Sequence, residues 1–274
     1  MKGKVILVGA GPGDPELLTI KAYRTLQTAD VILADRLVSP EILRSYASPQ
    51  AEIVYVGKQC RRGTSTPQAT INELMVSHAS EGKLVVRLKG GDVSIFSNVL
   101  DELETLVQHN IPYEIIPGVT AALGAAAYCG IPLTARNHST AVRFLTAYKS
   151  DVVTEAYWQE LAQTEDTLVF YMSSETLDNV VAKLVENGIS AAKELAVIEQ
   201  ATTAYQKVYT SNLYDYETTL KDKVFFSPTL VIIGKVVGLH KQFGWKPEET
   251  QTVEYFKSLY ETPATTIEIL GLTA

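Results

Sequence analysis

The sequence has few of the residues that build disulfide frameworks or metal sites. Among its 274 residues there are two cysteines, Cys60 and Cys129, and four histidines. The cysteines do not form a Cys-x-x-Cys pair, and two cysteines cannot make a disulfide framework. No two histidines stand at the spacing of metal ligands. We therefore expect neither a disulfide-rich fold nor a metal site.

Long apolar runs and an excess of basic residues are also missing. No uninterrupted apolar run is long enough to cross a bilayer. The first residues, Met1–Gly9, lead into a strand-like segment and lack the apolar stretch and cleavage site of a signal peptide. The formal net charge is −7, whereas nucleic-acid binding usually needs a basic face. We expect a cytoplasmic protein with no membrane or nucleic-acid partner.

What the sequence does contain is a regular alternation of strand-like and helix-like segments over residues 1–120. Short apolar runs predict strands, and apolar residues at helical spacing predict helices. The predicted strands are Lys4–Val8, Val31–Ala34, Ile53–Val56, Leu84–Leu88 and Tyr113–Ile116, and the predicted helices are Leu17–Ala29, Gln68–Ser80 and Leu100–His109. Such alternation implies crossover connections, so we predict an α/β fold with a mostly parallel sheet.

The remaining segments predict a second α/β domain. Its predicted strands are Val142–Thr146, Leu168–Met172, Leu195–Ile198 and Thr229–Ile233, with Tyr205–Thr210 as a possible edge strand and helices at Thr120–Cys129 and Thr176–Asn187. We place the boundary in the segment Pro117–Arg136. The predicted organisation is an N-terminal α/β domain (1–120), a C-terminal α/β domain (121–245) and a polar C-terminal extension (246–274).

The strongest local signal is a glycine-rich turn, VGAGPGDP, that follows the first predicted strand. Gly9 and Gly11 match the first two glycines of a dinucleotide-binding turn, and Asp35 ends the second strand, where a ribose-binding acid would lie. A nicotinamide-dependent oxidoreductase is therefore one alternative, and a purely structural turn is another.

Two features of the turn argue against a pyrophosphate. Asp14 occupies the position of the third glycine and would bring a carboxylate to the phosphates. Pro12 and Pro15 lack the backbone N–H groups that bind phosphate. We predict that Asp14 caps a helix with Pro15 at its first position, and that the turn receives a ligand without phosphates.

A second glycine bend lies at residues 87–92, RLKGGD, where a strand ends in two glycines and an acid. Glycines allow the backbone to approach a ligand closely, and ligands of open α/β sheets bind beyond the carboxyl ends of the strands. The bend is consistent with a ligand site, although a Gly-Gly-Asp loop also occurs without one.

Taken together, six segments resemble one known family. VGAGPGDPELLTIKA, ADRLVSPEIL, VGK, VVRLKGGD, PGVTAALGAAAYCGIPLTAR and LVFYM occur in this order. They are similar to the tetrapyrrole methylases, the class III S-adenosylmethionine-dependent methyltransferases. Residues 35–39 (DRLVS) and 56–58 (VGK) resemble the uroporphyrinogen-III C-methyltransferases of that family. The resemblance covers about residues 4–245.

The resemblance implies a fold, a cofactor and particular residues. The fold would be two α/β domains with the cofactor cleft between them, in a homodimer. The residues implied to contact S-adenosylmethionine, and its product S-adenosylhomocysteine, are Pro12, Gly90, Gly91, Asp92, Ile95, Thr120, Ala121, Met172 and Ala201. By the same match Asp35 is the proton acceptor and Lys58 the proton donor. By residue type alone, Asp35 could instead cap a turn and Lys58 could be a surface charge.

Substrate contacts are expected from arginines near the proposed strand ends. A tetrapyrrole of this pathway carries many carboxylates, and the forked guanidinium suits them. The substrate-binding hypothesis names Arg36, Arg61, Arg62 and Arg136, each of which could equally be a solvated surface residue.

The sequence departs from the family pattern in three places. The family's Pro-Phe and glycine-rich stretch after Gly-Gly-Asp is replaced by residues 93–101, VSIFSNVLD, with Ser97 or Asn98 as a possible helix cap. The loop 59–67 is shorter and lacks the family's histidine. The family's Thr-His-Arg and Thr-Gly-His are Thr-Ala-Arg (134–136) and Thr-Ala-Tyr (146–148) here.

We expect an enzyme that methylates uroporphyrinogen III to precorrin-2 for sirohaem or cobalamin synthesis. The alternatives are a methylase of the same family acting on another tetrapyrrole, the oxidoreductase named above, and a non-catalytic protein that binds the cofactor.

Overall fold

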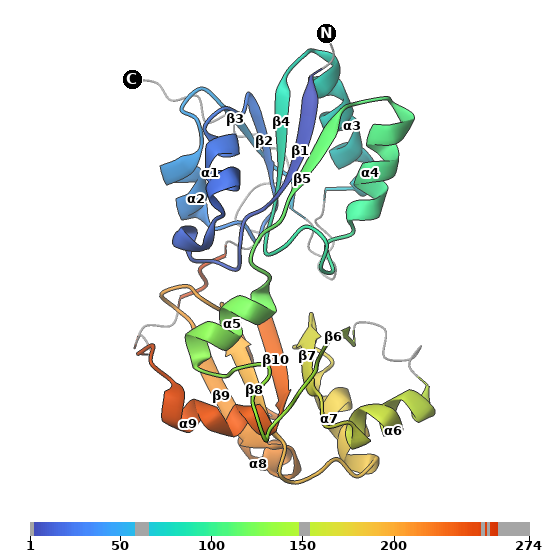
Figure 1. Cartoon of the computed structure of the whole chain (residues 1–274), viewed down its shortest axis with the longest axis vertical. Coiled ribbons are helices and arrows are strands. Elements are labelled where there is room, and N and C mark those ends of the chain that lie inside the picture. Colours follow the sequence, from blue (N-terminus) through green and yellow to red (C-terminus); the bar gives the residue numbers. More distant parts are fainter. Residues whose placement is uncertain (1–2, 58–65, 148–153, 248–249, 251–252, 257–274) are drawn as a thin grey trace. The chain divides into compact units, whose positions relative to one another are not determined.

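The computed structural model describes residues 3–57, 66–147, 154–247, 250 and 253–256 (Figure 1). The chain divides into two compact units. Among the described residues, the first unit contains those up to Thr120 together with Phe256, and the second contains those from Ala121 to Tyr255. Each unit has its own sheet of five strands in the described part of the chain, and its own core.

The sheet of the first unit is entirely parallel. Its strands are β1 (Lys4–Gly9), β2 (Val31–Ala34), β3 (Glu52–Tyr55), β4 (Leu84–Lys89) and β5 (Tyr113–Ile116), in the order β3-β2-β4-β1-β5. Parallel neighbours need crossover connections, and helices supply most of them. The predicted parallel α/β arrangement of this part of the chain is confirmed.

Helices cover both faces of this sheet (Figure 1). They are η1 (Pro15–Leu17), α1 (Ile20–Leu26), α2 (Pro40–Tyr46), α3 (Gln68–Ser80) and α4 (Val99–Gln108). Side chains of a strand alternate between faces. Ile6 and Val8 therefore pack in one cluster with residues of α1 and α2, whereas Val5 and Leu7 pack in another with residues of α3 and α4.

The second unit has a mixed sheet. Its strands are β6 (Val142–Thr146), β7 (Thr167–Tyr171), β8 (Glu194–Glu199), β9 (Lys207–Asn212) and β10 (Thr229–Gly234), in the order β6-β7-β10-β8-β9. β10 pairs antiparallel with both β7 and β8, so these two strands run in the same direction. β9 lies at one edge of the sheet, as predicted for the segment beginning at Tyr205.

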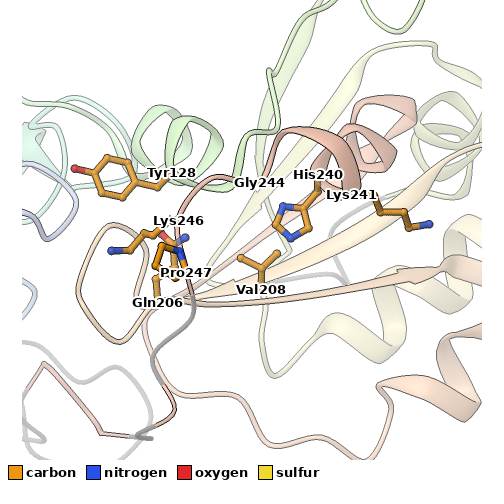
Figure 2. A pocket seen from close by; sticks show the side chains of 8 residues that line it. All are labelled: Tyr128, Gln206, Val208, His240, Lys241, Gly244, Lys246 and Pro247. Carbon is orange, nitrogen blue, oxygen red and sulfur yellow. The ribbon is translucent and has the colours of Figure 1, made fainter.

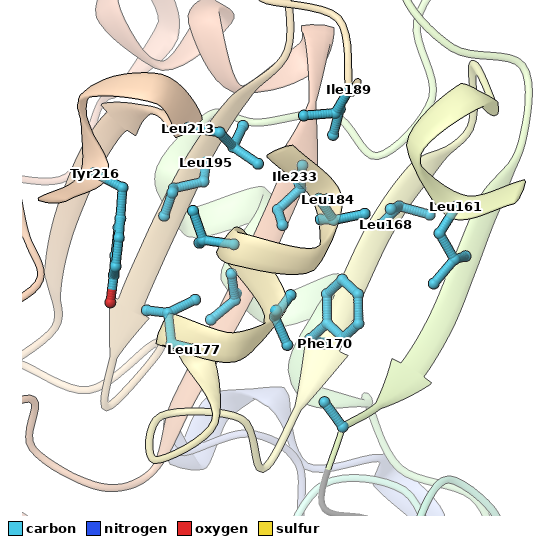
Figure 3. Packing of buried hydrophobic residues seen from close by; sticks show 14 of the residues in the cluster. Leu161, Leu168, Phe170, Leu177, Leu184, Ile189, Leu195, Leu213, Tyr216 and Ile233 are labelled. Carbon is cyan, nitrogen blue, oxygen red and sulfur yellow. The ribbon is translucent and has the colours of Figure 1, made fainter. Parts of the chain in front are cut away.

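Two clusters fill the faces of this second sheet. The helical elements are α5 (Ala121–Cys129), α6 (Glu155–Gln163), α7 (Leu177–Glu186), η3 (Leu213–Asp215), α8 (Tyr216–Thr219), η4 (Lys235–Leu239) and α9 (His240–Phe243). Figure 3 shows α7 packing through Leu177 and Leu184 near Phe170 and Ile233 of the sheet. The opposite face packs against the small residues of α5 and against η4.

Four α-helices of the described chain were not predicted, and one predicted helix is broken. The pattern read as one helix over Leu17–Ala29 is instead η1 followed by α1. The break occurs because the hydroxyl of Thr19, in extended conformation, accepts a hydrogen bond from the amide of Ala22 and so begins a new helix. The helical elements that the apolar patterns did not indicate are α2, α6, α8 and α9 and the short helices η3 and η4.

Within the described residues, no helix combines the length and the hydropathy that crossing a membrane requires.

Candidate functional site

The carboxyl ends of β1, β4 and β5 bring three loops together in the first unit. Because parallel strands end at the same edge, the residues after Gly9, Lys89 and Ile116 lie close to one another. The two glycine bends are joined directly: the Gly11 amide donates to the Gly91 carbonyl at 3.1 Å, and the Gly91 amide donates to the Gly11 carbonyl at 2.8 Å. The two glycine bends singled out in the sequence therefore form one structural feature.

The approach of these loops depends on the absence of side chains. A Cβ atom on Gly9 would lie 2.6 Å from the Gly118 nitrogen and 2.8 Å from the Gly91 oxygen. A Cβ atom on Gly118 would lie 2.3 Å from that same oxygen. Real Cβ atoms do not come so close to backbone atoms, so both positions require glycine. We call these three loops, residues 9–13, 90–92 and 117–118, the glycine junction.

Asp92 ties the third loop to the second. Its Oδ2 accepts a hydrogen bond from the Gly118 amide at 2.9 Å, and its Oδ1 accepts from the Ser94 amide at 2.8 Å. Burial acts to raise the pKa of Asp92, but the hydrogen bonds from Ser94 and Gly118 outweigh it and hold the pKa below its usual value. Asp92 is therefore an ionised acceptor within the glycine junction. Pro12 is buried there, and Ile95 is half-buried beyond Ser94.

Asp14 caps the short helix η1, as predicted. Its Oδ1 accepts a hydrogen bond from the Glu16 amide at 2.9 Å, and Pro15 is the first residue of the helix. The carboxylate therefore occupies the helix N-terminus where a pyrophosphate would have to bind. This geometry does not favour the oxidoreductase alternative.

Asp35 follows β2 directly and is part of a buried ion network. Its Oδ1 accepts from Nη2 of Arg87 at 2.6 Å. Nε of Arg87 donates to Oε1 of Glu102 at 2.8 Å, and Nζ of Lys89 donates to Oε2 of Glu102 at 2.6 Å. The side chains of Arg87, Lys89 and Glu102 are 2%, 4% and 0% exposed, whereas that of Asp35 is 28% exposed. Asp35 is thus the one member of the network with substantial access to solvent.

The charges in this network shift the pKa of both cations. Burial acts to lower the pKa of Arg87, but the nearby Asp35 and Glu102 carboxylates outweigh it and raise the pKa. For Lys89, burial and the Arg87 charge together lower the pKa despite the contact with Glu102.

The sequence contained a signal for the network that the site prediction did not use. Arg87 and Lys89 interrupt an otherwise apolar strand at alternate positions, which places two cations on the same face of a buried sheet. Such cations need buried anions, and Glu102 on α4 supplies one.

The second unit brings three further predicted cofactor residues to one edge of its sheet. Tyr171 and Ile198 flank Leu230 of β10, so the ends of β7 and β8 lie roughly 10 Å apart, or two strand spacings. Met172 follows β7 and is 51% exposed, whereas Ala201 follows β8 and is buried. The Ala122 amide at the start of α5 donates to the Tyr171 hydroxyl at 3.0 Å, which places Ala121 at this edge too. Thr120, the preceding residue, is buried.

The turn after β8 is held by side-chain amides. Gln200 and Thr202 have positive φ angles of 46° and 69°. The Thr202 amide donates to Oε1 of Gln206 at 2.7 Å. The Gln200 side chain donates to the Val253 carbonyl at 2.9 Å and accepts from the Tyr255 amide at 2.6 Å. A short piece of the C-terminal extension is thereby bonded to the turn that carries Ala201.

The second unit also contains a pocket away from these residues. It has a volume of about 260 Å³ and is lined by Tyr128, Gln206, Val208, His240, Lys241, Gly244, Lys246 and Pro247, as Figure 2 shows. None of the predicted site residues lines it. His240 is engaged structurally, because its Nδ1 lies 2.6 Å from the Cys129 carbonyl at the end of α5.

The other predicted catalytic and substrate residues are only partly described. Lys58, Arg61 and Arg62 lie outside the described residues. Arg36 is half-buried next to Asp35, and Arg136 is exposed in the second unit. Within the described part of the chain, no three His, Cys, Asp or Glu side chains are grouped as metal ligands would be.

Comparison with known proteins identifies the family of this chain. The chain belongs to the tetrapyrrole (corrin/porphyrin) methylases, whose family model matches residues 4–217. Among individual proteins, the siroheme synthase of Pseudomonas aeruginosa is 48% identical over 243 residues, which are 89% of this chain and 52% of that protein. A siroheme synthase of Pseudomonas fluorescens is 46% identical over the same shares. The chain thus spans about half the length of the curated relatives that it matches.

Solved structures of the same kind align over most of the chain. The uroporphyrin-III C-methyltransferase of Thermus thermophilus has a TM-score of 0.74 and 34% identity, covering 90% of this chain and 99% of that one. The same enzyme in complex with S-adenosylhomocysteine has a TM-score of 0.71 and 35% identity, covering 86% of this chain and 100% of that one. A cobalt precorrin-4 methyltransferase has a TM-score of 0.75 and 27% identity, covering 85% and 95%.

Proposed function

We propose that the chain binds S-adenosylmethionine and transfers its methyl group to carbon atoms of uroporphyrinogen III, producing precorrin-2. The observation that carries the proposal is the glycine junction beside Asp35, in a chain whose solved relative from Thermus thermophilus was obtained with S-adenosylhomocysteine. The names of the siroheme synthase relatives support the substrate.

The residues of the junction fit the cofactor. The bare backbone at Gly90 and Gly91 and the ionised Asp92 offer close approach and a hydrogen-bond acceptor without phosphate-binding features. We assign cofactor contacts to Pro12, Gly90, Gly91, Asp92, Ile95, Thr120, Ala121, Met172 and Ala201. When bound, S-adenosylmethionine supplies a methyl group already activated on a sulfonium.

The protein's own contribution is positioning and proton transfer. Holding reactants in line can lower a barrier by roughly 7–11 kcal/mol. A pyrrole ring that accepts a methyl group on one of its carbons gains positive charge, and the macrocycle must lose a proton from another position to become neutral. In our proposal the Asp35 carboxylate stabilises that charge and accepts the proton. Lys58 donates a proton elsewhere on the macrocycle, and a second proton leaves to solvent, so each methyl transfer releases one proton overall. Arg36, Arg61, Arg62 and Arg136 bind substrate carboxylates.

The test of the reaction is mass spectrometry of its products. Uroporphyrinogen III, generated enzymatically under anaerobic conditions, is incubated with the chain and methyl-labelled cofactor. We expect a product that carries two labelled methyl groups. A chain that binds S-adenosylhomocysteine but labels no reduced tetrapyrrole would contradict the proposal and favour a non-catalytic binder.

The role of Asp35 is tested by Asp35→Asn. We expect turnover to fall by about 100-fold or more, because general acid–base catalysis contributes about 10²–10⁴. The affinity for S-adenosylhomocysteine, measured by calorimetry, should stay near that of the wild type. Asp222→Asn, at an exposed position of the second unit, is the matched control and should keep wild-type turnover. Full activity in Asp35→Asn would remove Asp35 from the mechanism.

A second candidate is methylation of another tetrapyrrole. The cobalt precorrin-4 methyltransferase has a TM-score similar to that of the uroporphyrin enzyme, which favours this alternative. The residues after Asp92 also depart from the family's glycine-rich stretch, and Asn98 has a left-handed backbone there. Labelling of a later precorrin, without labelling of uroporphyrinogen III, would select this candidate.

We also propose that the chain acts as a homodimer in the cytoplasm, as the family resemblance implies. Light scattering of the purified protein would test the dimer, and cell fractionation would test the location.

A further inference from the structure

The buried ion network behind Asp35 contains three residues to which the proposed reaction assigns no role. Arg87 and Lys89 lie two residues apart on β4 and therefore face the same side of the sheet, the side covered by α3 and α4. Glu102 projects from α4 and binds one cation with each carboxylate oxygen. With Asp35, the network pairs two cations with two anions.

Stability alone does not explain why such a network is kept. Each buried ion loses its hydration, and apolar side chains of similar volume often stabilise a core equally well or better. Three of the four members are almost fully buried, whereas the fourth is Asp35, which follows the carboxyl end of β2. The network therefore places fixed positive charge behind one accessible carboxylate.

The guanidinium of Arg87 has little freedom to move. It donates through Nε to Glu102, through Nη1 to the Leu33 carbonyl at 3.2 Å, and through Nη2 to Asp35. These partners belong to α4, to β2 and to the residue that follows β2. A planar donor group bonded on three sides has one orientation, and it fixes one oxygen of Asp35. In the described part of the chain, the other oxygen of Asp35 has no hydrogen bond.

We propose that Arg87 is the positioning residue for Asp35. Glu102 holds Arg87 in place, and Lys89 pairs with the other oxygen of Glu102. Arg87 binds Oδ1 and orients the carboxylate so that Oδ2 faces the substrate carbon that loses a proton. This inference rests on the proposed function, because it assigns Asp35 the role of proton acceptor.

The decisive variant replaces the three buried ions together. In Arg87→Met/Lys89→Met/Glu102→Met, the three buried charges are removed together and only Asp35, which has access to solvent, loses a partner, so the chain should fold with a melting temperature near that of the wild type. The affinity for S-adenosylhomocysteine should change by less than about twofold, and KM should change little. The value of kcat should fall by about 100-fold, the loss that a small misplacement of a catalytic group can cause.

Two further variants separate positioning from general effects. Arg87→Lys keeps the positive charge but loses the planar, forked set of guanidinium donors, and it should also lower kcat. The control is Arg143→Lys, because Arg143 binds Asp166 and Glu160 in the same two-carboxylate manner in the second unit. This control should leave kcat unchanged.

The same triple substitution in an Asp35→Asn background tests whether the network acts through Asp35. We expect a further loss of no more than about twofold there, because residues that act as a unit are not additive. A folded triple variant with wild-type kcat would overturn this inference alone, and so would a full 100-fold loss in the Asp35→Asn background. If the triple variant does not fold, a wild-type kcat in Arg87→Lys overturns it. A wild-type chain that methylates no tetrapyrrole would overturn the proposed function and this inference with it.

Discussion

Adding a single methyl group at Gly9 tests the glycine junction directly. In Gly9→Ala the new Cβ would lie 2.6, 2.7 and 2.8 Å from three backbone atoms of Gly118 and Gly91. None of these atoms belongs to a flexible side chain, so at least one loop must move. Overpacking of this kind typically costs about 1–3 kcal/mol. For a chain of roughly this size, each kcal/mol lowers Tm by about 2–4 °C.

Binding should suffer together with stability. Movement of the loop at Gly91 displaces Asp92, whose carboxylate accepts a hydrogen bond from the Gly118 amide. If the displacement weakens the binding free energy of S-adenosylhomocysteine by about 1.4 kcal/mol, the affinity falls tenfold. Differential scanning fluorimetry gives the Tm, and titration calorimetry gives the affinity.

The matched control for this experiment is Gly238→Ala. A Cβ at Gly238 would lie 3.5 Å from Oε1 of Glu194, an ordinary contact. Gly238 lies in the helical segment η4, where alanine loses less conformational entropy on folding. We therefore expect Gly238→Ala to keep or slightly raise Tm and to leave ligand affinity unchanged. If Gly9→Ala behaved like this control, the close packing of the junction would be refuted.

Three other predictions concern stability. Leu184→Ala removes a fully buried side chain from the core shown in Figure 3 and should cost about 2–5 kcal/mol in urea unfolding; a loss below about 1 kcal/mol would contradict the packing. Asp14→Ala removes the cap of η1 and should cost about 0.5–2 kcal/mol by the same assay, and an unchanged midpoint would show that the cap is unimportant. Burial raises the pKa of Glu199 above its ordinary value of 4.5, so its contribution to stability is full at acidic pH and is lost as the pH rises through the raised pKa. Glu199→Gln should therefore raise Tm near neutral pH, with the gain shrinking towards pH 4, whereas a gain that grows on acidification would reverse the assigned sign.

Apolar pattern predicted most of the fold because the strands are buried. Val31–Ala34 is apolar at every position and fully buried, and α3 has the predicted bounds, Gln68–Ser80. The two longest of the unpredicted helices, α2 and α6, had weaker patterns but did carry start signals. α2 begins with Ser39, Pro40 and Glu41, and α6 begins with a Thr154 hydroxyl that accepts the Tyr157 amide.

Strand order in the second unit could not be predicted from periodicity. β10 lies between β7 and β8 although the chain reaches it last, and local pattern contains no information on such long-range pairing. The same limit applies to the site. The motifs identified Asp35 and Asp92, whereas the contact between Arg87 and Glu102 depends on how α4 packs against the sheet. The double-glycine bend predicted close approach of the backbone to a ligand, whereas the close packing of the Gly91 oxygen against Gly9 and Gly118 was not predicted.

The hydrogen bonds between Gln200 and the segment 253–255 make the methylase region depend on residues outside the part that the family model matches. The family model ends at residue 217, yet the buried amide of Gln200, one position before Ala201, is satisfied by backbone groups more than fifty residues later. Shortening the chain ahead of Val253 would leave that amide buried without either partner, which typically costs about 1–3 kcal/mol. The segment 253–255 thus holds the turn that contains Ala201. A truncation that leaves every family motif intact would still destabilise this turn.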